Sequence, residues 1–126
     1  MTILKEIEAL VQSPLHSTEP LTGNLELSLP EKFFAFSGHF PGQPILPAVL
    51  QLKIGIYLCQ KLVGRELFLT SIDRAKFLTP AGPDTNLKVS ARMRPDGNGN
   101  NHYGAEIKID EGAKKIATFS LILRAY

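Results

Sequence analysis

The chain has 126 residues, of which 44% are hydrophobic, and its 14 basic and 12 acidic side chains give a net charge of +2. This size and composition predict one globular domain, residues 1–126, with a single core. Charges of both signs are interspersed, which argues against the basic surface that nucleic acids require. Cys59 is the only cysteine, which excludes an intrachain disulfide and a cysteine-rich zinc site and favours a reducing compartment.

The first apolar stretch does not have the character of a signal peptide, because Lys5, Glu6 and Glu8 interrupt it. No apolar run approaches the roughly 20 residues that cross a bilayer as a helix. We therefore expect a cytoplasmic protein without a membrane span.

The N-terminal half predicts a short helix, a strand and an irregular loop. Apolar residues recur at helical spacing over residues 2–12, and Pro14 with the polar stretch after it should end this helix, which we expect to pack as a lid. Leucines alternate with polar residues over 25–29, which predicts a half-buried strand that residues 33–36 extend. Two glycines and three prolines within residues 36–47 exclude regular structure there.

The remaining chain predicts one buried helix followed by strands. Pro47 is suited to a helix start, the run from Ala48 to Val63 is apolar on nearly every face, and Gly64 ends it. Strands are expected over residues 67–77, 87–93, 103–109 and 116–123, and the turn residues between the last three predict an antiparallel meander. A single curved sheet wrapped around the helix makes the fold class α+β, and its uncovered edge favours dimerisation.

A core around the central helix is predicted from the apolar spacing. We expect these residues to contribute to it: Phe34, Phe36, Leu50, Ile54, Ile56, Leu58, Phe77, Ala105, Phe119 and Leu121.

Two segments resemble a known family. The stretch from Gly38 to Leu50 reads Gly-His-Phe-Pro-Gly-Gln-Pro-Ile-Leu-Pro-Ala-Val-Leu. It resembles the signature His-Phe-Pro-Gly-x-Pro-x-x-Pro-Gly-Val-Leu of the bacterial 3-hydroxyacyl-acyl-carrier-protein dehydratases of the FabA/FabZ type. The stretch from Ile72 to Asp84 resembles that family's Lys-Phe-x-x-Pro-x-x-Pro-Gly-Asp segment, with Gly and Pro transposed. The resemblance covers about residues 25–125 and implies a hot-dog fold.

Catalytic and binding roles follow from the resemblance. It implies that His39 is the general base that removes the α-proton, a task suited to imidazole near neutral pH. The family uses the backbone N–H at the position of Ala48 as an oxyanion donor, and alanine in place of the family's glycine keeps that group. The substrate-binding residues implied with it are Phe40, Gly42, Pro47 and Val49.

Lys53 departs from the family pattern. Fourteen residues after the histidine, on the inward face of the helix, the family carries a Glu or Asp as general acid. A lysine there has two interpretations that both stay open. Its ammonium lies in the tunnel, where it donates a proton or binds an anion, or its stem packs on Val49, Leu50 and Tyr57 while the charge reaches solvent. Gln51 lies two residues earlier and could point elsewhere.

Other reactive side chains have no comparable context. We expect Tyr57, Cys59 and Gln60 to be core or interface residues, because nothing nearby supplies the base that a cysteine nucleophile needs. His16 and His102 are predicted at the surface. Lys76 and the basic strand faces could meet a phosphopantetheine arm or an acidic carrier protein, although such charges are more often solvated.

The function expected from the resemblance is dehydration of 3-hydroxyacyl thioesters, on acyl carrier protein or CoA, in fatty-acid or related lipid and polyene biosynthesis. No metal or redox cofactor is implied. The resemblance further implies a homodimer or higher oligomer in which the His39 loop lies beside the neighbour's Lys53. The alternatives are a catalytically silent hot-dog subunit that binds acyl chains or carrier protein, favoured by Lys53, and an acyl thioesterase.

Overall fold

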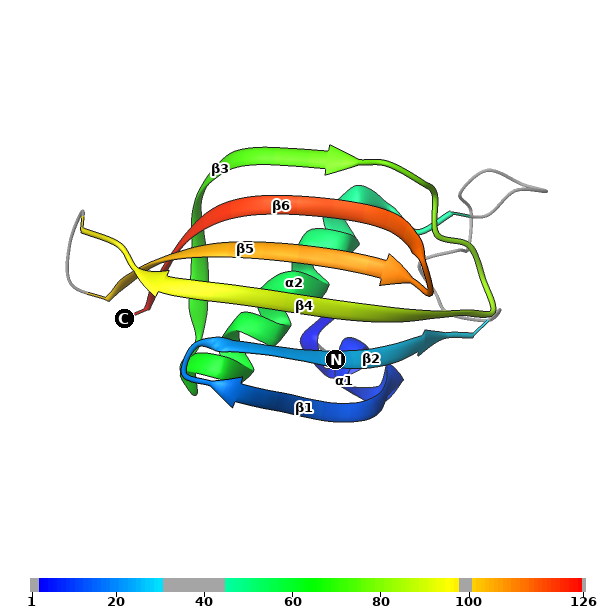
Figure 1. Ribbon diagram of the computed structural model, residues 1–126, viewed down its shortest axis with the longest axis horizontal. Coiled ribbons are helices and arrows are strands. Elements are labelled where there is room, and N and C mark those ends of the chain that lie inside the picture. Colours follow the sequence, from blue (N-terminus) through cyan, green and yellow to red (C-terminus); the bar gives the residue numbers. More distant parts are fainter. Residues whose placement is uncertain (1–2, 31–44, 98–100, 126) are drawn as a thin grey trace.

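The computed structural model describes residues 3–30, 45–97 and 101–125. These residues form two helices and one six-stranded sheet (Figure 1). In chain order the elements are α1 (Ile3–Leu10), β1 (Val11–Glu19), β2 (Thr22–Leu29), α2 (Ala48–Val63), β3 (Leu67–Phe77), β4 (Thr85–Pro95), β5 (His102–Glu111) and β6 (Lys114–Ala125).

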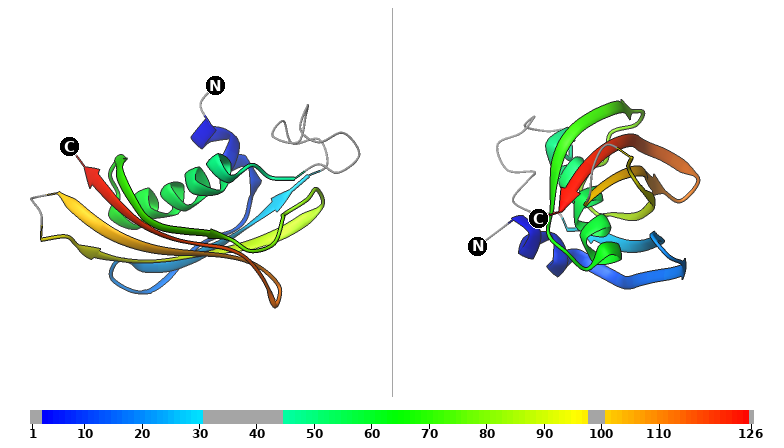
Figure 2. Two further views of the ribbon diagram at one scale, coloured as in Figure 1. Left: turned by 90° about the horizontal axis from the view of Figure 1, so that it is seen from above. Right: turned by 90° about the vertical axis from the view of Figure 1, so that its left-hand side faces the viewer.

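The sheet has the order β1-β2-β4-β5-β6-β3, and every neighbouring pair is antiparallel. It curves so that α2 lies along its concave side (Figure 2). The predicted α+β class and the meander of the last three strands are therefore confirmed. The strand β3 follows α2 directly in sequence yet pairs with β6 at the far edge.

The helix α2 begins and ends at the residues that the sequence predicted, Pro47 and Gly64. Pro47 is the N-cap residue, with an extended backbone at φ −61° and ψ 149°. Gly64 closes the helix in the left-handed region at φ 76°, and its N–H donates to the carbonyl of Gln60 at 2.8 Å. A residue without a Cβ adopts this conformation at little cost, which explains why α2 ends at Gly64.

One strand was not predicted. The stretch after the first helix, for which the sequence predicted no regular element, forms the edge strand β1, whose pairing with β2 shifts register three times. Pro14 is compatible with an edge strand because its missing N–H removes no interior ladder bond. The helix predicted over residues 2–12 ends at Leu10, so its predicted end was two residues late.

The core lies between α2 and the concave face of the sheet. Of the predicted core residues, these six are buried: Leu50, Ile54, Leu58, Ala105, Phe119 and Leu121. Ile56 is partly buried against the core, whereas Phe34 and Phe36 lie outside the described residues. The prediction for Phe77 was wrong, since its side chain is 47% exposed although its ring packs 5.5 Å from that of Phe119.

The helix α1 covers part of α2, as expected for a lid-like element. Its Ile7 is buried, and its Glu8 carboxylate accepts hydrogen bonds from Lys61 at 3.1 Å and from Tyr57 at 3.3 Å. The hydrogen bond from Lys61 and its positive charge lower the pKa of Glu8, while burial raises the pKa of Tyr57. These contacts attach α1 to the C-terminal half of α2.

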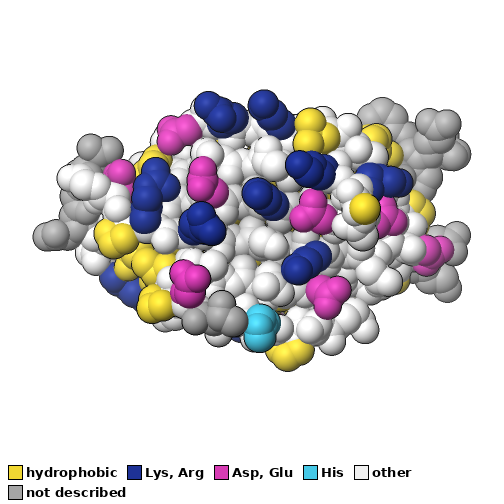
Figure 3. All heavy atoms as spheres, in the orientation of Figure 1, with side chains coloured by type: hydrophobic (Ala, Val, Ile, Leu, Met, Phe, Trp, Pro, Cys, Tyr) yellow, Lys and Arg dark blue, Asp and Glu magenta, His cyan; other side chains and the backbone are white. Residues whose placement is uncertain are grey.

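Apolar side chains remain exposed on one side of the chain. Every described residue of β3 from Leu69 onward is exposed, and Ile72 and Leu78 add to an uncovered apolar surface beside Phe77. The convex face differs, because Lys, Arg, Asp and Glu side chains are mixed there (Figure 3). Within the described residues, neither helix is long and apolar enough to cross a bilayer.

Candidate active site

A cavity of about 290 Å³ opens at the N-terminal end of α2. Two chain segments form its wall, one leading into the helix and one following β3. The lining residues are Ile45, Leu46, Pro47, Ala48, Gln51, Phe77, Thr79 and Pro80. Both segments belong to the two stretches that resemble the dehydratase family.

Backbone hydrogen bonds hold the two segments together. The N–H of the buried Leu46 donates to the carbonyl of Ala81 at 2.7 Å, and the N–H groups of Leu78 and Thr79 donate to the carbonyl of Ile116. Because these bonds join the helix entrance to the sheet, the cavity wall is fixed by main-chain geometry and not by mobile side chains.

The first turn of α2 supplies hydrogen-bond donors at this cavity. The N–H groups of Leu50 and Gln51 donate to the carbonyl of Pro47 at 3.1 and 3.2 Å. Within the described residues, the N–H groups of Ala48 and Val49 have no acceptor, as is usual in a first helical turn. The helix dipole adds partial positive charge there. This arrangement can stabilise negative charge that develops on a substrate oxygen.

The structure brings some of the predicted site residues together. Pro47 and Ala48 line the cavity, whereas the side chain of Val49 is 58% exposed and does not line it. His39, Phe40 and Gly42 lie outside the described residues, so their roles stay predictions from the sequence.

Lys53 is exposed in the single chain and is not part of this cavity. Residues two positions apart on a helix point to roughly opposite sides, which places Lys53 away from Gln51. Within one chain this exposure agrees with the interpretation in which the charge of Lys53 reaches solvent, and its position in a tunnel formed with a neighbouring chain stays a prediction. Its ammonium is available to solvent or to a second chain.

Gln51 is the site residue that the sequence analysis passed over. It lines the cavity, is only 4% exposed, and donates from Nε2 to the carbonyl of Leu46 at 3.2 Å. Its Oε1 is buried without a hydrogen-bond partner in the described part of the chain. An amide in the apolar first turn of the helix, three residues after Ala48, was the signal that could have identified it.

The other reactive side chains behave as predicted, except His102, which was expected at the surface and is half-buried. Cys59 is fully buried, and burial raises the pKa of its thiol to about 12, which removes the nucleophilic thiolate at neutral pH. Tyr57 is buried, and Gln60 accepts a hydrogen bond from the N–H of Leu67 at 2.9 Å. His16 is exposed, and His102 is half-buried.

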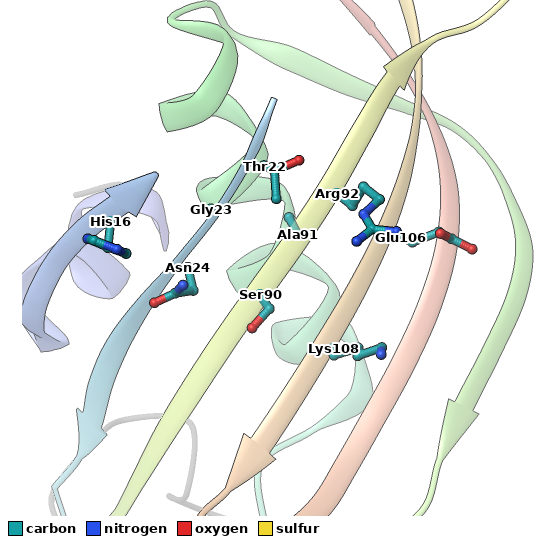
Figure 4. A pocket seen from close by; sticks show the side chains of 9 residues that line it. All are labelled: His16, Thr22, Gly23, Asn24, Ser90, Ala91, Arg92, Glu106 and Lys108. Atoms are coloured by element: carbon teal, nitrogen blue, oxygen red, sulfur yellow. The ribbon is translucent and has the colours of Figure 1, made fainter. Parts of the chain in front are cut away.

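A second hollow, of about 250 Å³, lies on the convex face between β1, β2, β4 and β5 (Figure 4). Polar and charged side chains line it, including His16, Ser90, Arg92 and Lys108. The sheet separates it from the cavity at the start of α2. Among the residues that the structure describes, no cluster of three or more His, Cys, Asp or Glu could hold a metal ion.

Known structures share this architecture. The dehydratase heterocomplex ApeI:P from Xenorhabdus doucetiae matches with a TM-score of 0.74 at 22% identity, over 88% of this chain and 94% of that one. The Escherichia coli PaaI protein from the phenylacetic acid degradation operon matches with a TM-score of 0.70 at 14% identity, over 97% and 86%. These matches, with the curved antiparallel sheet around α2, define a hot-dog fold.

Sequence comparison identifies the family within this fold class. The family model ApeI-like, described as ApeI dehydratase, matches residues 16–118. The 3-hydroxyacyl-[acyl-carrier-protein] dehydratase FabZ of Syntrophomonas wolfei is 33% identical over 100 residues, which cover 74% of this chain and 68% of that enzyme. The FabZ of Fusobacterium nucleatum is 32% identical over 78 residues, covering 58% of this chain and about half, 54%, of that enzyme. The chain belongs to the ApeI-like dehydratase family.

Proposed function

We propose that the protein removes water from 3-hydroxyacyl thioesters, carried on acyl carrier protein or CoA, to give 2-enoyl thioesters. The observation that carries this proposal is the cavity at the start of α2 in a chain of the dehydratase family. Ala48 lines this cavity together with largely apolar side chains, and its N–H has no acceptor among the described residues. Fatty-acid or related polyene biosynthesis is the setting that fits this chemistry.

In the proposed mechanism the thioester oxygen accepts a hydrogen bond from the Ala48 N–H. This stabilises the enolate that forms when His39 takes the proton from the α-carbon. The bond from the β-carbon to the hydroxyl then breaks, the electron pair of the enolate forms the double bond, and the hydroxyl leaves as water after it takes a proton. Imidazolium at position 39 can return that proton, so the elimination balances with one acid–base residue.

We further propose that the protein acts as a homodimer that pairs along the edge of β3. The exposed apolar side chains Leu69, Ile72, Phe77 and Leu78 lie on or beside this edge strand, and an unpaired edge with such a surface favours association. In such a dimer the solvent-exposed Lys53 is free to approach the neighbour's His39 loop. Sedimentation at micromolar concentration tests the pairing, and a monomer there would contradict the composite site.

The activity test measures substrate-dependent formation of the 2-enoyl thioester by wild type, His39→Ala, Lys53→Ala and Lys53→Glu. We expect His39→Ala to lose the activity. If Lys53 contributes from the neighbouring chain, Lys53→Ala lowers the rate, and Lys53→Glu restores or raises it because it reinstates the family's carboxylic acid. Full wild-type activity that survives His39→Ala would refute the mechanism.

The second candidate is a catalytically silent subunit that binds acyl chains or carrier protein and pairs with an active partner. Lys53, which stands where the family carries a carboxylic acid, favours it. The matched structure from Xenorhabdus doucetiae is a dehydratase heterocomplex, which shows that chains of this fold occur in mixed assemblies. A wild type inactive on every chain length, with activity gained in Lys53→Glu, would support this candidate over the enzyme.

A further inference from the structure

Gln51 combines burial with an unmet hydrogen-bonding capacity. Among residues 3–30, 45–97 and 101–125 it is the one polar or charged side chain classed as buried. Its Nε2 donates to the Leu46 carbonyl. Since a carbonyl can only accept a hydrogen bond, the atom that contacts it must be the amide nitrogen, and the other terminal atom must be the oxygen Oε1. Oε1 is therefore the end without a partner in the part of the chain that the structure describes. A buried acceptor left unpaired is unfavourable, and a polar group in that state points to a missing donor.

The position of Gln51 identifies where that donor would come from. Gln51 lies three residues after Ala48, and residues at this spacing are neighbours on one side of a helix. Both line the cavity at the start of α2, whose remaining wall is largely apolar. The cavity thus has an N–H donor at Ala48, and Gln51, about one helical turn along α2, contributes to its wall a side chain whose acceptor Oε1 is itself buried. The last torsion of a glutamine side chain is soft, so a small rotation presents Oε1 to a ligand.

We propose that Gln51 Oε1 accepts a hydrogen bond from the 3-hydroxyl group of the substrate while the Ala48 N–H binds the thioester oxygen. This inference rests on the proposed function, because it takes a 3-hydroxyacyl thioester as the ligand. The two substrate oxygens are separated by three carbon atoms, a span suited to groups one helical turn apart. Gln51 is then a residue that selects hydroxylated acyl chains and releases the 2-enoyl product, which has no hydroxyl to donate.

A merely structural role for Gln51, to hold Leu46, predicts something different. Loss of that role would weaken binding of every acyl ligand equally. A role toward the hydroxyl predicts a loss confined to ligands that carry one. The distinction needs two ligands that differ only in the hydroxyl and that do not react.

The experiment uses 2,2-dimethyl-3-hydroxyacyl pantetheine thioester and its 3-deoxy analogue, which lack an α-proton and so cannot be dehydrated. Calorimetric titration gives both dissociation constants for wild type, Gln51→Leu and Gln51→Glu. We expect wild type to bind the hydroxylated ligand about 10-fold more tightly than the deoxy ligand, the size expected for one hydrogen bond with a buried partner. In Gln51→Leu this ratio should fall to about 1, with the deoxy affinity retained.

The Gln51→Glu variant provides the rescue. A neutral glutamic acid can donate to the Leu46 carbonyl and accept from the hydroxyl as glutamine does, and burial favours its neutral form. The ratio should therefore recover at about pH 5 in Gln51→Glu and not in Gln51→Leu. If Gln51→Leu does not fold, the Gln51→Glu variant still tests the proposal through the pH dependence of this ratio.

The inference is overturned by a wild-type ratio of about 1, by an equal ratio in wild type and Gln51→Leu, or by equal weakening of both ligands. These outcomes are separate from those of the activity assay. If the wild type dehydrates no 3-hydroxyacyl thioester but its affinity ratio depends on Gln51, the proposed function is refuted and the hydroxyl-binding role of Gln51 is retained. If the wild type does dehydrate these substrates but the affinity ratio is unchanged by substitution of residue 51, only the hydroxyl-binding role of Gln51 is refuted.

Discussion

The contact between Gly55 and Ile107 sets how closely α2 approaches the sheet. A Cβ placed on Gly55 would lie 2.8 Å from Cδ1 and 3.1 Å from Cγ2 of Ile107, a fully buried residue of β5. These distances are shorter than ordinary van der Waals contacts, so Gly55→Ala must displace either the isoleucine or the helix. The same helix carries Ala48 and Gln51 into the candidate site.

The expected stability change is a balance of two effects. Alanine in place of glycine favours a helix interior by about 1 kcal/mol. An extra methyl group in a filled core costs about 1–3 kcal/mol. We therefore expect Gly55→Ala to lower the free energy of unfolding by about 1 kcal/mol. Ile107→Val removes Cδ1, the nearer atom, and by itself should cost a further roughly 1 kcal/mol.

The double variant Gly55→Ala with Ile107→Val tests whether steric contact with Ile107 causes the stability loss of Gly55→Ala. The new methyl group occupies the space that Cδ1 vacates, so the double variant should be at least about 1 kcal/mol more stable than the sum of the single changes predicts. Urea unfolding followed by far-ultraviolet circular dichroism at one protein concentration measures all four proteins. Additivity within about 0.5 kcal/mol, or a Gly55→Ala variant more stable than wild type, would refute the reasoning.

Three other changes test separate features. Because the folded chain holds the Cys59 pKa at about 12, up from 9.0, the unfolded state alone loses this proton as pH rises past 9. The stability advantage of wild type over Cys59→Ala should therefore shrink by up to about 1.4 kcal/mol per pH unit above pH 9, measured by urea unfolding, and a pH-independent difference would contradict it. The Glu8 pKa is lowered from 4.5, so its contribution is present above that pH and lost as pH falls through the folded pKa. Glu8→Gln should speed hydrogen exchange in α1 at pH 7, by a factor that decreases as pH falls below 4.5, and a factor independent of pH would contradict it. Gly64→Ala forces alanine to φ 76° and should cost about 1 kcal/mol in urea unfolding, whereas the control Gly97→Ala, in open space, should cost little, and equal costs would contradict it.

Local signals predicted most of the fold. Pro47 and Gly64 marked the central helix because each residue has a restricted or permissive backbone that suits one helix end. Alternation predicted the strands of the meander, since one of their faces is buried and the other is wet. β1 was missed because an edge strand has only one partner and tolerates proline, so its residues need not alternate.

The candidate site was harder to predict for a physical reason. A helix that is apolar on nearly every face has no clear phase, so the sequence alone did not show that Gln51 faces the cavity and Lys53 faces solvent. The exposure of Phe77 was missed for a related reason. An apolar residue that is exposed in one chain contributes to the same sequence pattern as a residue buried within it.

The order of the strands has a consequence for how the chain folds as it is made. β3 pairs only with β6, from Leu67 opposite Ala125 to Phe77 opposite Ala117. On the ribosome β3 emerges well before its partner, and throughout that interval both of its edges and its apolar side chains are available to other nascent chains. The time needed to synthesise residues 78–125, which include β4, β5 and β6, then sets a lower limit on the length of this aggregation-prone stage, whether or not α2 has already formed.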